Sequence, residues 1–139
     1  MTTEVVQVRG ITFIGKAASG HWIPMDGPAD FAGSDAATRP KELILISLGG
    51  CTGADVASIL SKMKEDITRF IINIDAETAN EHPKVFTTIH ITYTFWGKEL
   101  KESNIEKAIF LSQDRYCSVT AMLKKAVEIT HSYEINPDA

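Results

Sequence analysis

The sequence predicts a single domain, residues 1–139, of mixed α/β (α+β) structure. Three observations predict this class. A long apolar helical pattern runs from Arg39 to Met63, strand patterns rich in β-branched and aromatic residues lie on both sides of it, and a second helical region precedes a last alternating segment. A chain of 139 residues with 44% hydrophobic content can bury one core but is too short for two ordinary domains.

The N-terminal region is predicted to form a hairpin. Residues 4–14 are rich in valine, isoleucine and phenylalanine, and Gly10 is the expected site of a bend or bulge. Residues 21–26 have the pattern of a short returning strand, in which Pro24 favours an edge position. Residues 27–38 are rich in small, turn-forming residues and predict a loop that either lies over a site or only connects.

The central helix is predicted to be buried. Pro40 suits its first turn, where the missing N–H would have no partner in any case. From Leu43 to Leu48 the helix is apolar on almost every face, whereas a surface helix shows a single apolar stripe. We therefore expect this half to be covered on several sides, by its own sheet and by a second subunit.

One polar line runs along this helix. Its members recur at steps of four, four and three, which places them on a single helical face: Ser47, Cys51, Asp55 and Ser58. Three glycines surround the cysteine, at a cost of about 1 kcal/mol each relative to alanine: Gly49, Gly50 and Gly53. They either open space beside the thiol for a ligand or a neighbouring backbone, or allow tight packing around an inert buried cysteine.

Two strands should follow the helix. Residues 67–78 alternate between apolar and polar, with slippage near Ile71, and residues 85–96 form the clearest strand pattern in the chain. The two strands are expected to pair as an antiparallel hairpin. His90, placed mid-strand among threonines, either hydrogen-bonds a neighbour on the sheet face or acts as a ligand or base.

Two helices and a last strand complete the prediction. Ser103 and Glu106 form an S-x-x-E capping box for a helix over residues 104–113. A further helix restarts at Cys117, with Cys117 or Ser118 at its cap, and a thiol at this helix start would meet unpaired N–H groups and the helix dipole, which favour a thiolate. The positive charge of Arg115 would also favour a Cys117 thiolate. The alternative is that Cys117 is a buried residue that only begins the helix. Residues 128–135 alternate as a last strand.

Composition argues against several function classes. The net charge of -4 and the scattered lysines give no basic stripe, so no nucleic-acid partner is expected. The N-terminus lacks the pattern of a secretion signal, and we expect no segment of the about 18 apolar residues that span a bilayer. The sequence therefore predicts a cytoplasmic protein without a membrane partner.

The two cysteines favour redox chemistry over metal binding. Cys51 and Cys117 lack a Cys-x-x-Cys spacing and a His-x-x-x-His partner, so no metal site is expected, and no cofactor is expected either. Without a secretion signal the pair should stay reduced, and a disulfide between them would be transient.

The residues around both cysteines resemble a known family. The run from Pro40-Lys41-Glu42-Leu43 to Gly49-Gly50-Cys51, and the segment Tyr116-Cys117-Ser118-Val119, resemble the osmotically inducible protein C (OsmC) and organic hydroperoxide resistance (Ohr) family. The order of the elements matches along nearly the whole chain, and residues 18–21 and 129–134 look most like a YhfA-like branch. The resemblance implies an OsmC-like intertwined homodimer, with antiparallel sheets around long, central, buried helices and two sites at the interface.

The resemblance also implies an activity. In the peroxidase members, a helix cysteine attacks a hydroperoxide as a thiolate and becomes a sulfenic acid, and a second cysteine then forms a disulfide that an external dithiol reduces. By position, Cys51 would be the peroxidatic residue and Cys117 the resolving residue. The expected partners are a second copy of the chain, a small hydrophobic hydroperoxide and a dithiol reductant.

This sequence departs from the peroxidase pattern at one position. Those members carry a glutamate directly after the proline, paired with an arginine, whereas here Lys41 follows Pro40 and Glu42 comes one place later. On a straight helix Glu42 points about 180° away from Cys51 and cannot simply replace that glutamate. The arginine has three candidates by chemistry alone: Arg9, Arg39 and Arg115.

Asp55 raises a second question, because a carboxylate one turn from Cys51 would raise the pKa of the thiol unless a cation neutralised it. Arg115 and Lys41 are the candidates for that cation.

Two functions stay open for this protein. One is a thiol-dependent peroxidase of the oxidative stress response that reduces organic hydroperoxides. The other is a non-enzymatic protein that binds a small hydrophobic or electrophilic ligand or senses redox state. Proximity of the two thiols distinguishes these functions, because a disulfide needs Cα atoms that lie within about 7 Å or that a modest loop motion brings there.

Overall fold

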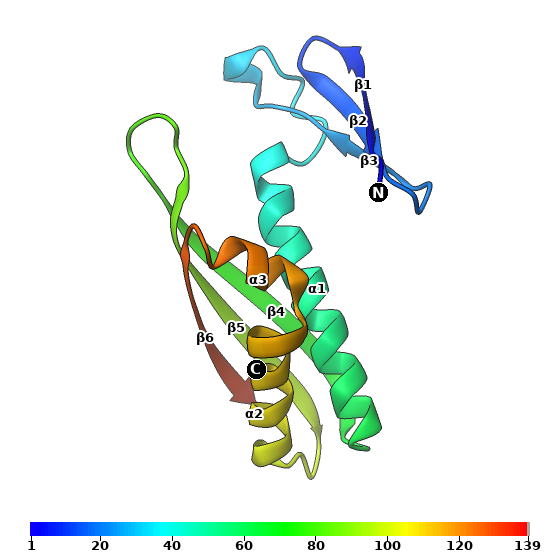
Figure 1. The fold of residues 1–139 in the computed structure, drawn as a ribbon, viewed down its shortest axis with the longest axis vertical. Helices are drawn as coiled ribbons and strands as arrows, with labels where there is room; N and C mark the ends of the chain where they lie inside the picture. The colour runs from blue at the N-terminus through cyan, green and yellow to red at the C-terminus, as the bar shows by residue number, and fades with distance from the viewer. Residues whose placement is uncertain (139) are drawn as a thin grey trace. The chain divides into compact units, whose positions relative to one another are not determined.

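The computed structural model describes residues 1–138, and the chain separates into two compact units, Met1–Ile46 and Ser47–Ala139 (Figure 1). The first unit holds a three-stranded sheet, and the second holds another three-stranded sheet with helices. Helix α1 (Pro40–Lys62) begins in the first unit and ends in the second. The predicted mixed α and β structure is confirmed.

The N-terminal sheet has three strands in the order β1 (Glu4–Arg9), β2 (Thr12–Lys16) and β3 (Trp22–Met25), all antiparallel to their neighbours. The prediction of one strand through residues 4–14, bent at Gly10, is wrong. Arg9 pairs with Thr12, so the chain reverses at Gly10, whose φ of +54° is readily adopted by glycine. A tight turn, rather than a bulge, interrupts the apolar run.

Asp26 organises the loop that follows β3. Its side chain is 1% exposed, and its carboxylate accepts N–H bonds from Gly27 at 2.8 Å, Ser34 at 3.0 Å and Ala36 at 3.1 Å. Burial favours the neutral acid, but these N–H donors outweigh it and hold the pKa of Asp26 below its ordinary value. The predicted loop therefore has a defined conformation around one buried carboxylate, with a short 3₁₀ turn, η1 (Ala29–Phe31), at its surface.

Glu42, the third residue of α1, caps the start of this helix. Glu42 Oε2 accepts the backbone N–H of Arg39 at 3.0 Å, the reach-back half of a capping box, and Pro40 stands where its missing N–H costs nothing. Arg39 in turn pairs with Asp35. Glu42 therefore has a structural role at the helix end.

The second unit is built on the sheet β4 (Asp66–Thr78), β5 (Phe86–Lys98) and β6 (Glu128–Ile135), in that order. The predicted antiparallel hairpin of β4 and β5 is confirmed. The expectation of purely antiparallel sheets is wrong for β6, which runs parallel to β5. Parallel neighbours need a crossover connection, and here the crossover contains the remaining helices.

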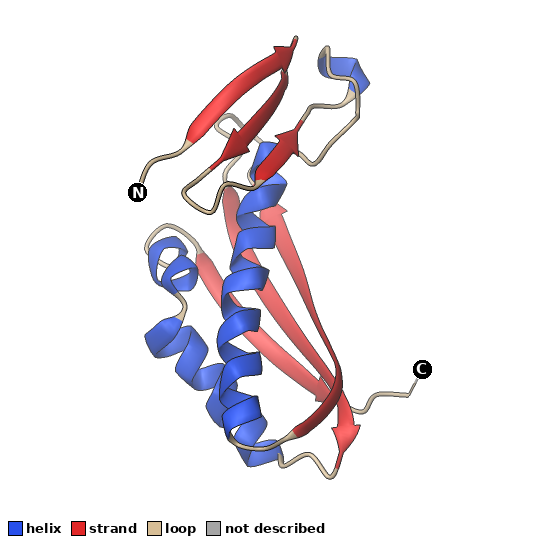
Figure 2. Ribbon diagram, turned by 90° about the vertical axis from the view of Figure 1, so that its right-hand side faces the viewer, coloured by secondary structure: helices blue, strands red, loops and turns tan. Residues whose placement is uncertain are grey.

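That crossover contains α2 (Glu102–Leu111), a π-helical turn η2 (Ser112–Tyr116) and α3 (Ser118–Leu123). The helices lie on one face of the sheet (Figure 2). The predicted Ser103 cap is wrong because Lys101 is the N-cap residue, and Glu65 accepts its backbone N–H at 3.1 Å. A carboxylate from the connection before β4 thus replaces the expected local cap.

The core of the second unit joins one stripe of α1 to the centre of β5 and the inner face of α2. Its fully buried apolar members are Leu48, Val56, Leu60, Ile89, Ile91, Tyr93, Phe95, Ile105, Ala108 and Ile109. His90 hydrogen-bonds Thr130 at 2.6 Å and Ser132 at 2.9 Å across to β6, so the prediction of a sheet-face histidine is confirmed.

Two of the helix glycines are packing positions. A Cβ on Gly53 would lie 2.8 Å from Ile72 Cδ1, and one on Gly49 would lie 3.2 Å from Ile74 Cδ1. These contacts favour close packing of α1 on β4 over an opening beside the thiol. A Cβ on Gly50 would meet no atom within 4 Å, because this glycine lies on the exposed side of the helix.

Helix α1 buries only one stripe within a single chain. Ile44 is 40% exposed and Ile46 is 58% exposed, so residues 1–138 leave these apolar side chains open to solvent. The expectation that no segment matches a bilayer span is also wrong, because α1 is long and apolar enough by composition. The same composition is found in core helices of soluble proteins.

Candidate functional site

Three side chains meet where α1 faces the start of α3. One donor atom each of Cys51, Asp55 and Cys117, two sulfurs and a carboxylate oxygen, lie within 4.8 Å of one another. Cys51 and Asp55 are one turn apart on α1, and Cys117 is the N-cap residue of α3. The fold thus brings together residues that are 66 positions apart in sequence.

Cys117 is the buried member of the pair, with 3% of its surface exposed. Its sulfur accepts the backbone N–H of Thr120 at 3.4 Å, and its own N–H bonds Ser112 O at 2.8 Å. Burial raises the pKa of Cys117 above its ordinary value despite the Thr120 donors. The prediction that the helix start favours a Cys117 thiolate is therefore wrong, because desolvation outweighs the helix end.

Cys51 shows the opposite balance. Burial opposes its ionisation, but the Val119 N–H, the Cys117 thiol and the Ser118 hydroxyl all donate toward its sulfur, and together they lower the pKa of Cys51. The Ser118 Oγ atom lies 3.9 Å from the Cys51 sulfur. The first turn of α3 thus stabilises the thiolate of the cysteine on α1, rather than that of the cysteine that begins α3.

Asp55 acts against this thiolate, since its charge raises the pKa of Cys51. Its carboxylate accepts a hydrogen bond from Ser112 Oγ at 3.1 Å. Among residues 1–138, Arg115 makes no ion pair with Asp55, and its guanidinium lies over the Tyr116 ring at 5.8 Å from the centroid. A hydroxyl, rather than the predicted guanidinium, is the structural partner of Asp55.

The other predicted supporting residues lie in the first unit. Lys41 and Glu42 belong to the first turn of α1, ten and nine positions before Cys51, and Glu42 is committed to the helix cap. Of the predicted polar line, Cys51 and Asp55 join the cluster with Cys117, while Ser58 lines the adjacent pocket. Ser47 is exposed on the same helix.

A buried hydrogen-bond network lies next to the cluster and is joined to it through Ser112, which bonds both Asp55 and Thr52. Thr52 Oγ1 lies 2.6 Å from Tyr93 Oη and 2.8 Å from Ser112 Oγ, and Gln113 Nε2 donates to both Thr52 at 3.0 Å and Tyr93 at 2.8 Å. Thr120 Oγ1 donates to Gln113 Oε1 at 3.4 Å, which links the network to α3. Burial raises the pKa of Tyr93 to about 12, so the phenol stays neutral.

This network was not predicted from the sequence. Its only local signal is a polar residue, Thr52, on the buried stripe of an apolar helix. The π-helical turn η2 places Ser112 and Gln113 toward that stripe, and such turns are often found at functional sites.

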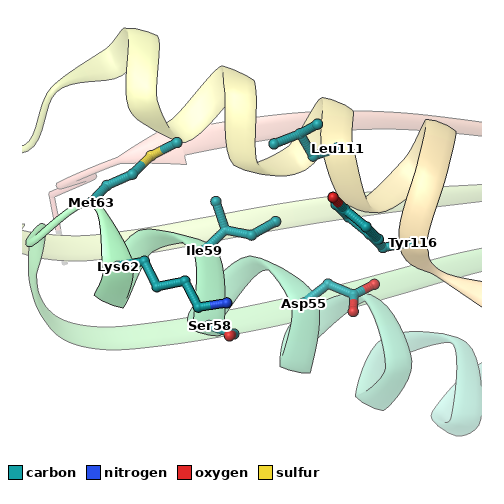
Figure 3. Close-up of a pocket in the computed structure, with 7 residues that line it drawn as sticks. All are labelled: Asp55, Ser58, Ile59, Lys62, Met63, Leu111 and Tyr116. Atoms are coloured by element: carbon teal, nitrogen blue, oxygen red, sulfur yellow. The ribbon is translucent and has the colours of Figure 1, made fainter.

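A pocket of about 380 Å³ opens beside Asp55. Figure 3 shows Asp55 and Tyr116 at one end and Met63 at the other, with α1 forming one wall. The full lining is Asp55, Ser58, Ile59, Lys62, Met63, Leu111 and Tyr116. The lining is thus mixed, with apolar side chains from Ile59, Met63 and Leu111 beside the polar Ser58 and Lys62, and the Asp55 carboxylate lies at the end nearer the cysteines.

Comparison with known proteins identifies the family. Residues 33–132 match the family described as OsmC-like protein, which is more than half of the chain. The chain belongs to the OsmC-like family. This OsmC-like chain is also 42% identical over 135 residues to protein YhfA of Escherichia coli strain K12, covering 97% of the chain and 98% of YhfA.

Solved structures agree with this assignment. A hypothetical protein from Aquifex aeolicus is 30% identical, with a TM-score of 0.80 over 98% of this chain and 97% of the other. The organic hydroperoxide resistance protein OhrB of Bacillus subtilis has the same fold at 15% identity, with a TM-score of 0.63 over 96% of this chain and 98% of OhrB. Helix α1 is accordingly the core helix of a soluble OsmC-like fold.

Proposed function

We propose that this OsmC-like protein is a thiol-dependent peroxidase that reduces organic hydroperoxides, with Cys51 as the peroxidatic and Cys117 as the resolving cysteine. The main support is the asymmetry between two adjacent thiols. Their sulfurs lie within 4.8 Å, and the pKa of Cys51 is lowered while that of Cys117 is raised. A nucleophilic thiolate beside a protonated thiol is the arrangement that a two-step reaction requires.

In the first step the Cys51 thiolate attacks the outer oxygen of the hydroperoxide and the O–O bond breaks. The alkoxide takes a proton and leaves as an alcohol, and Cys51 becomes a sulfenic acid. In the second step the sulfur of Cys117, after losing its proton, attacks the Cys51 sulfur. The S–S bond forms, the sulfenic hydroxyl takes that proton and leaves as water, and an external dithiol then restores both thiols.

The neighbouring pocket supports an organic rather than an inorganic peroxide. Its walls carry Ile59, Met63 and Leu111, and the exposed ring of Tyr116 closes the end near Asp55. This apolar part of the lining favours an apolar group on the substrate, since burying such a group gains about 25 cal/mol per Å², while Ser58 and Lys62 make the rest of the lining polar.

The decisive experiment oxidises the reduced protein with one equivalent of cumene hydroperoxide and maps its peptides without reduction. We expect a Cys51–Cys117 disulfide and turnover when a dithiol is supplied. In Cys117→Ser, Cys51 should stop as a sulfenic acid that dimedone traps, whereas Cys51→Ser, the matched control, should leave Cys117 reduced. Thiols that stay reduced in the wild-type protein would favour the alternative of a ligand-binding or redox-sensing protein.

We further propose that the protein acts as a cytoplasmic homodimer whose two units function as one OsmC-like domain over residues 1–139. The family match itself, residues 33–132, crosses the boundary between the units. The exposed apolar side chains of α1, Ile44 and Ile46, support a second copy as the missing cover.

A further inference from the structure

We propose that the reduced site is also a binding site for one thiophilic divalent cation of the Zn²⁺ type, held by Cys51, Cys117 and Asp55. This inference does not depend on peroxidase activity. It revises the expectation of no metal site, which rested on the lack of a Cys-x-x-Cys spacing and of a His-x-x-x-His partner. The third ligand, Asp55, and the closeness of Cys117 come from the fold.

The donor positions are close to those of a tetrahedral site. Zinc bonds of about 2.3 Å to sulfur and about 2.1 Å to oxygen place neighbouring ligand atoms roughly 3.6–3.8 Å apart. The three donor atoms here already lie within 4.8 Å of one another, so each pair has at most about 1 Å to close. Cys51 and Asp55, one turn apart on α1, have the same i, i+4 spacing that lets one helix supply two metal ligands.

Surrounding groups already hold two of these ligands in place. Ser112 Oγ donates to Asp55 Oδ2 at 3.1 Å, and the Thr120 N–H donates to the Cys117 sulfur at 3.4 Å. Outer donors of this kind orient metal ligands and offset the surplus of negative charge that two thiolates and a carboxylate bring to a divalent ion. Each thiol releases one proton to solvent when the cation binds.

A water molecule would complete the four ligands, as in zinc sites with three protein ligands. Asp55 also lines the adjacent pocket, so one of the three ligands borders space that water can enter. With two sulfur donors and a single carboxylate, the site should select Zn²⁺, Cd²⁺ or Co²⁺ over Mg²⁺ and Ca²⁺, which require mostly oxygen ligands. A cation bound here would occupy both thiolates and so compete directly with their oxidation.

Anaerobic titration of the reduced full-length protein with Co²⁺ tests this proposal. We expect one Co²⁺ per chain, with intense visible bands of tetrahedral cobalt and a sulfur-to-cobalt charge-transfer band that one equivalent of Zn²⁺ abolishes. Cys51→Ser and Cys117→Ser should each lose about half of the charge-transfer intensity and bind at least 10-fold more weakly. Oxidation to the disulfide should abolish binding.

Further variants distinguish Co²⁺ binding at the proposed site from Co²⁺ binding at other carboxylates of the protein. Asp55→Asn should weaken Co²⁺ binding while keeping the charge-transfer band, and Ser112→Ala should weaken it by about 10- to 100-fold. The matched control, Asp75→Asn, changes an exposed carboxylate of β4 and should bind as the wild type does. Circular dichroism of each variant verifies that it is folded.

Three results would overturn the proposal: no charge-transfer band at stoichiometric Co²⁺, octahedral cobalt only, or equal affinity in the wild type and both serine variants. The spectra are recorded without peroxide. A negative result would therefore leave the peroxidase proposal intact, and an inactive peroxidase would leave the metal site intact.

Discussion

At the scale of single residues, the two cysteines show that environment decides which thiol reacts. Both sulfurs lie near the first turn of α3, yet Cys117 is 3% exposed and loses more from desolvation than it gains from the Thr120 donors. Cys51, approaching from α1, receives donors from that turn while remaining partly exposed. The residue with the more favourable sequence position is thus the less acidic thiol.

This difference predicts the pH dependence of alkylation. Because the pKa of Cys51 is lowered, its reaction with iodoacetamide should reach half its maximal rate at a lower pH than that of a free cysteine measured under the same conditions. In the Cys51→Ser variant, Cys117 should reach half its maximal alkylation rate at a higher pH than a free cysteine, because Cys117 stays buried. Stopped-flow alkylation with peptide mapping provides both curves, and the reverse order would contradict the assigned roles.

At the scale of elements, the network of Thr52, Tyr93, Ser112 and Gln113 ties α1, β5 and η2 together. Removing the Thr52 hydroxyl deletes its buried hydrogen bonds to Tyr93, Ser112 and Gln113. We therefore expect Thr52→Val to lower the free energy of unfolding by about 1–3 kcal/mol.

The control is Thr52→Ser, which keeps the hydroxyl and deletes one methyl group, at a cost of about 1 kcal/mol. Urea denaturation of both variants measures the difference. If the valine variant were as stable as the wild type, the network would have no net stabilising effect.

The loop after β3 carries a prediction of its own, at the buried Asp26. Its folded-state pKa is lowered, so its contribution to stability is complete above the unfolded-state pKa of about 3.9 and is lost as pH falls through the folded-state value. Asp26→Asn should therefore be less stable than the wild type at pH 7. The difference in stability between the variant and the wild type should become smaller as the pH falls. Thermal melts of both proteins between neutral pH and about pH 3 measure this difference. A constant gap would show that the Asp26 charge makes no such contribution.

At the scale of the whole molecule, the exposed apolar side of α1 carries the prediction of a homodimer. Ile46 is 58% exposed in a single chain, where a charged substitution should change stability by less than about 0.5 kcal/mol. If a second copy covers this helix, Ile46→Asp places an unpaired charge in the interface and should shift the protein to monomers in sedimentation velocity.

Ser61→Asp is the matched control, because it adds the same charge at an exposed, already polar position of the same helix. It should sediment as the wild type does. A wild-type protein that is monomeric at high micromolar concentration would contradict the dimer proposal directly.

The sequence by itself predicted the mixed fold class, the central helix, the β4–β5 hairpin and the sheet-face role of His90, because periodicity and residue preference are local signals. It missed the turn at Gly10, the Glu65 cap of α2 and the parallel pairing of β6, and the last two depend on contacts between distant residues. Spacing along one helix also predicted that Cys51 and Asp55 share a face.

Only the tertiary structure decided what that face does. It brought Cys117 and the donors of α3 against Cys51, gave Asp55 a hydroxyl partner in place of a cation, and buried the network beneath them. The physical reason is that thiol acidity and metal affinity depend on desolvation and on the full set of donors within a few ångströms. The donors that η2 and α3 bring to α1 are 57 or more positions away in the sequence, which no local pattern encodes.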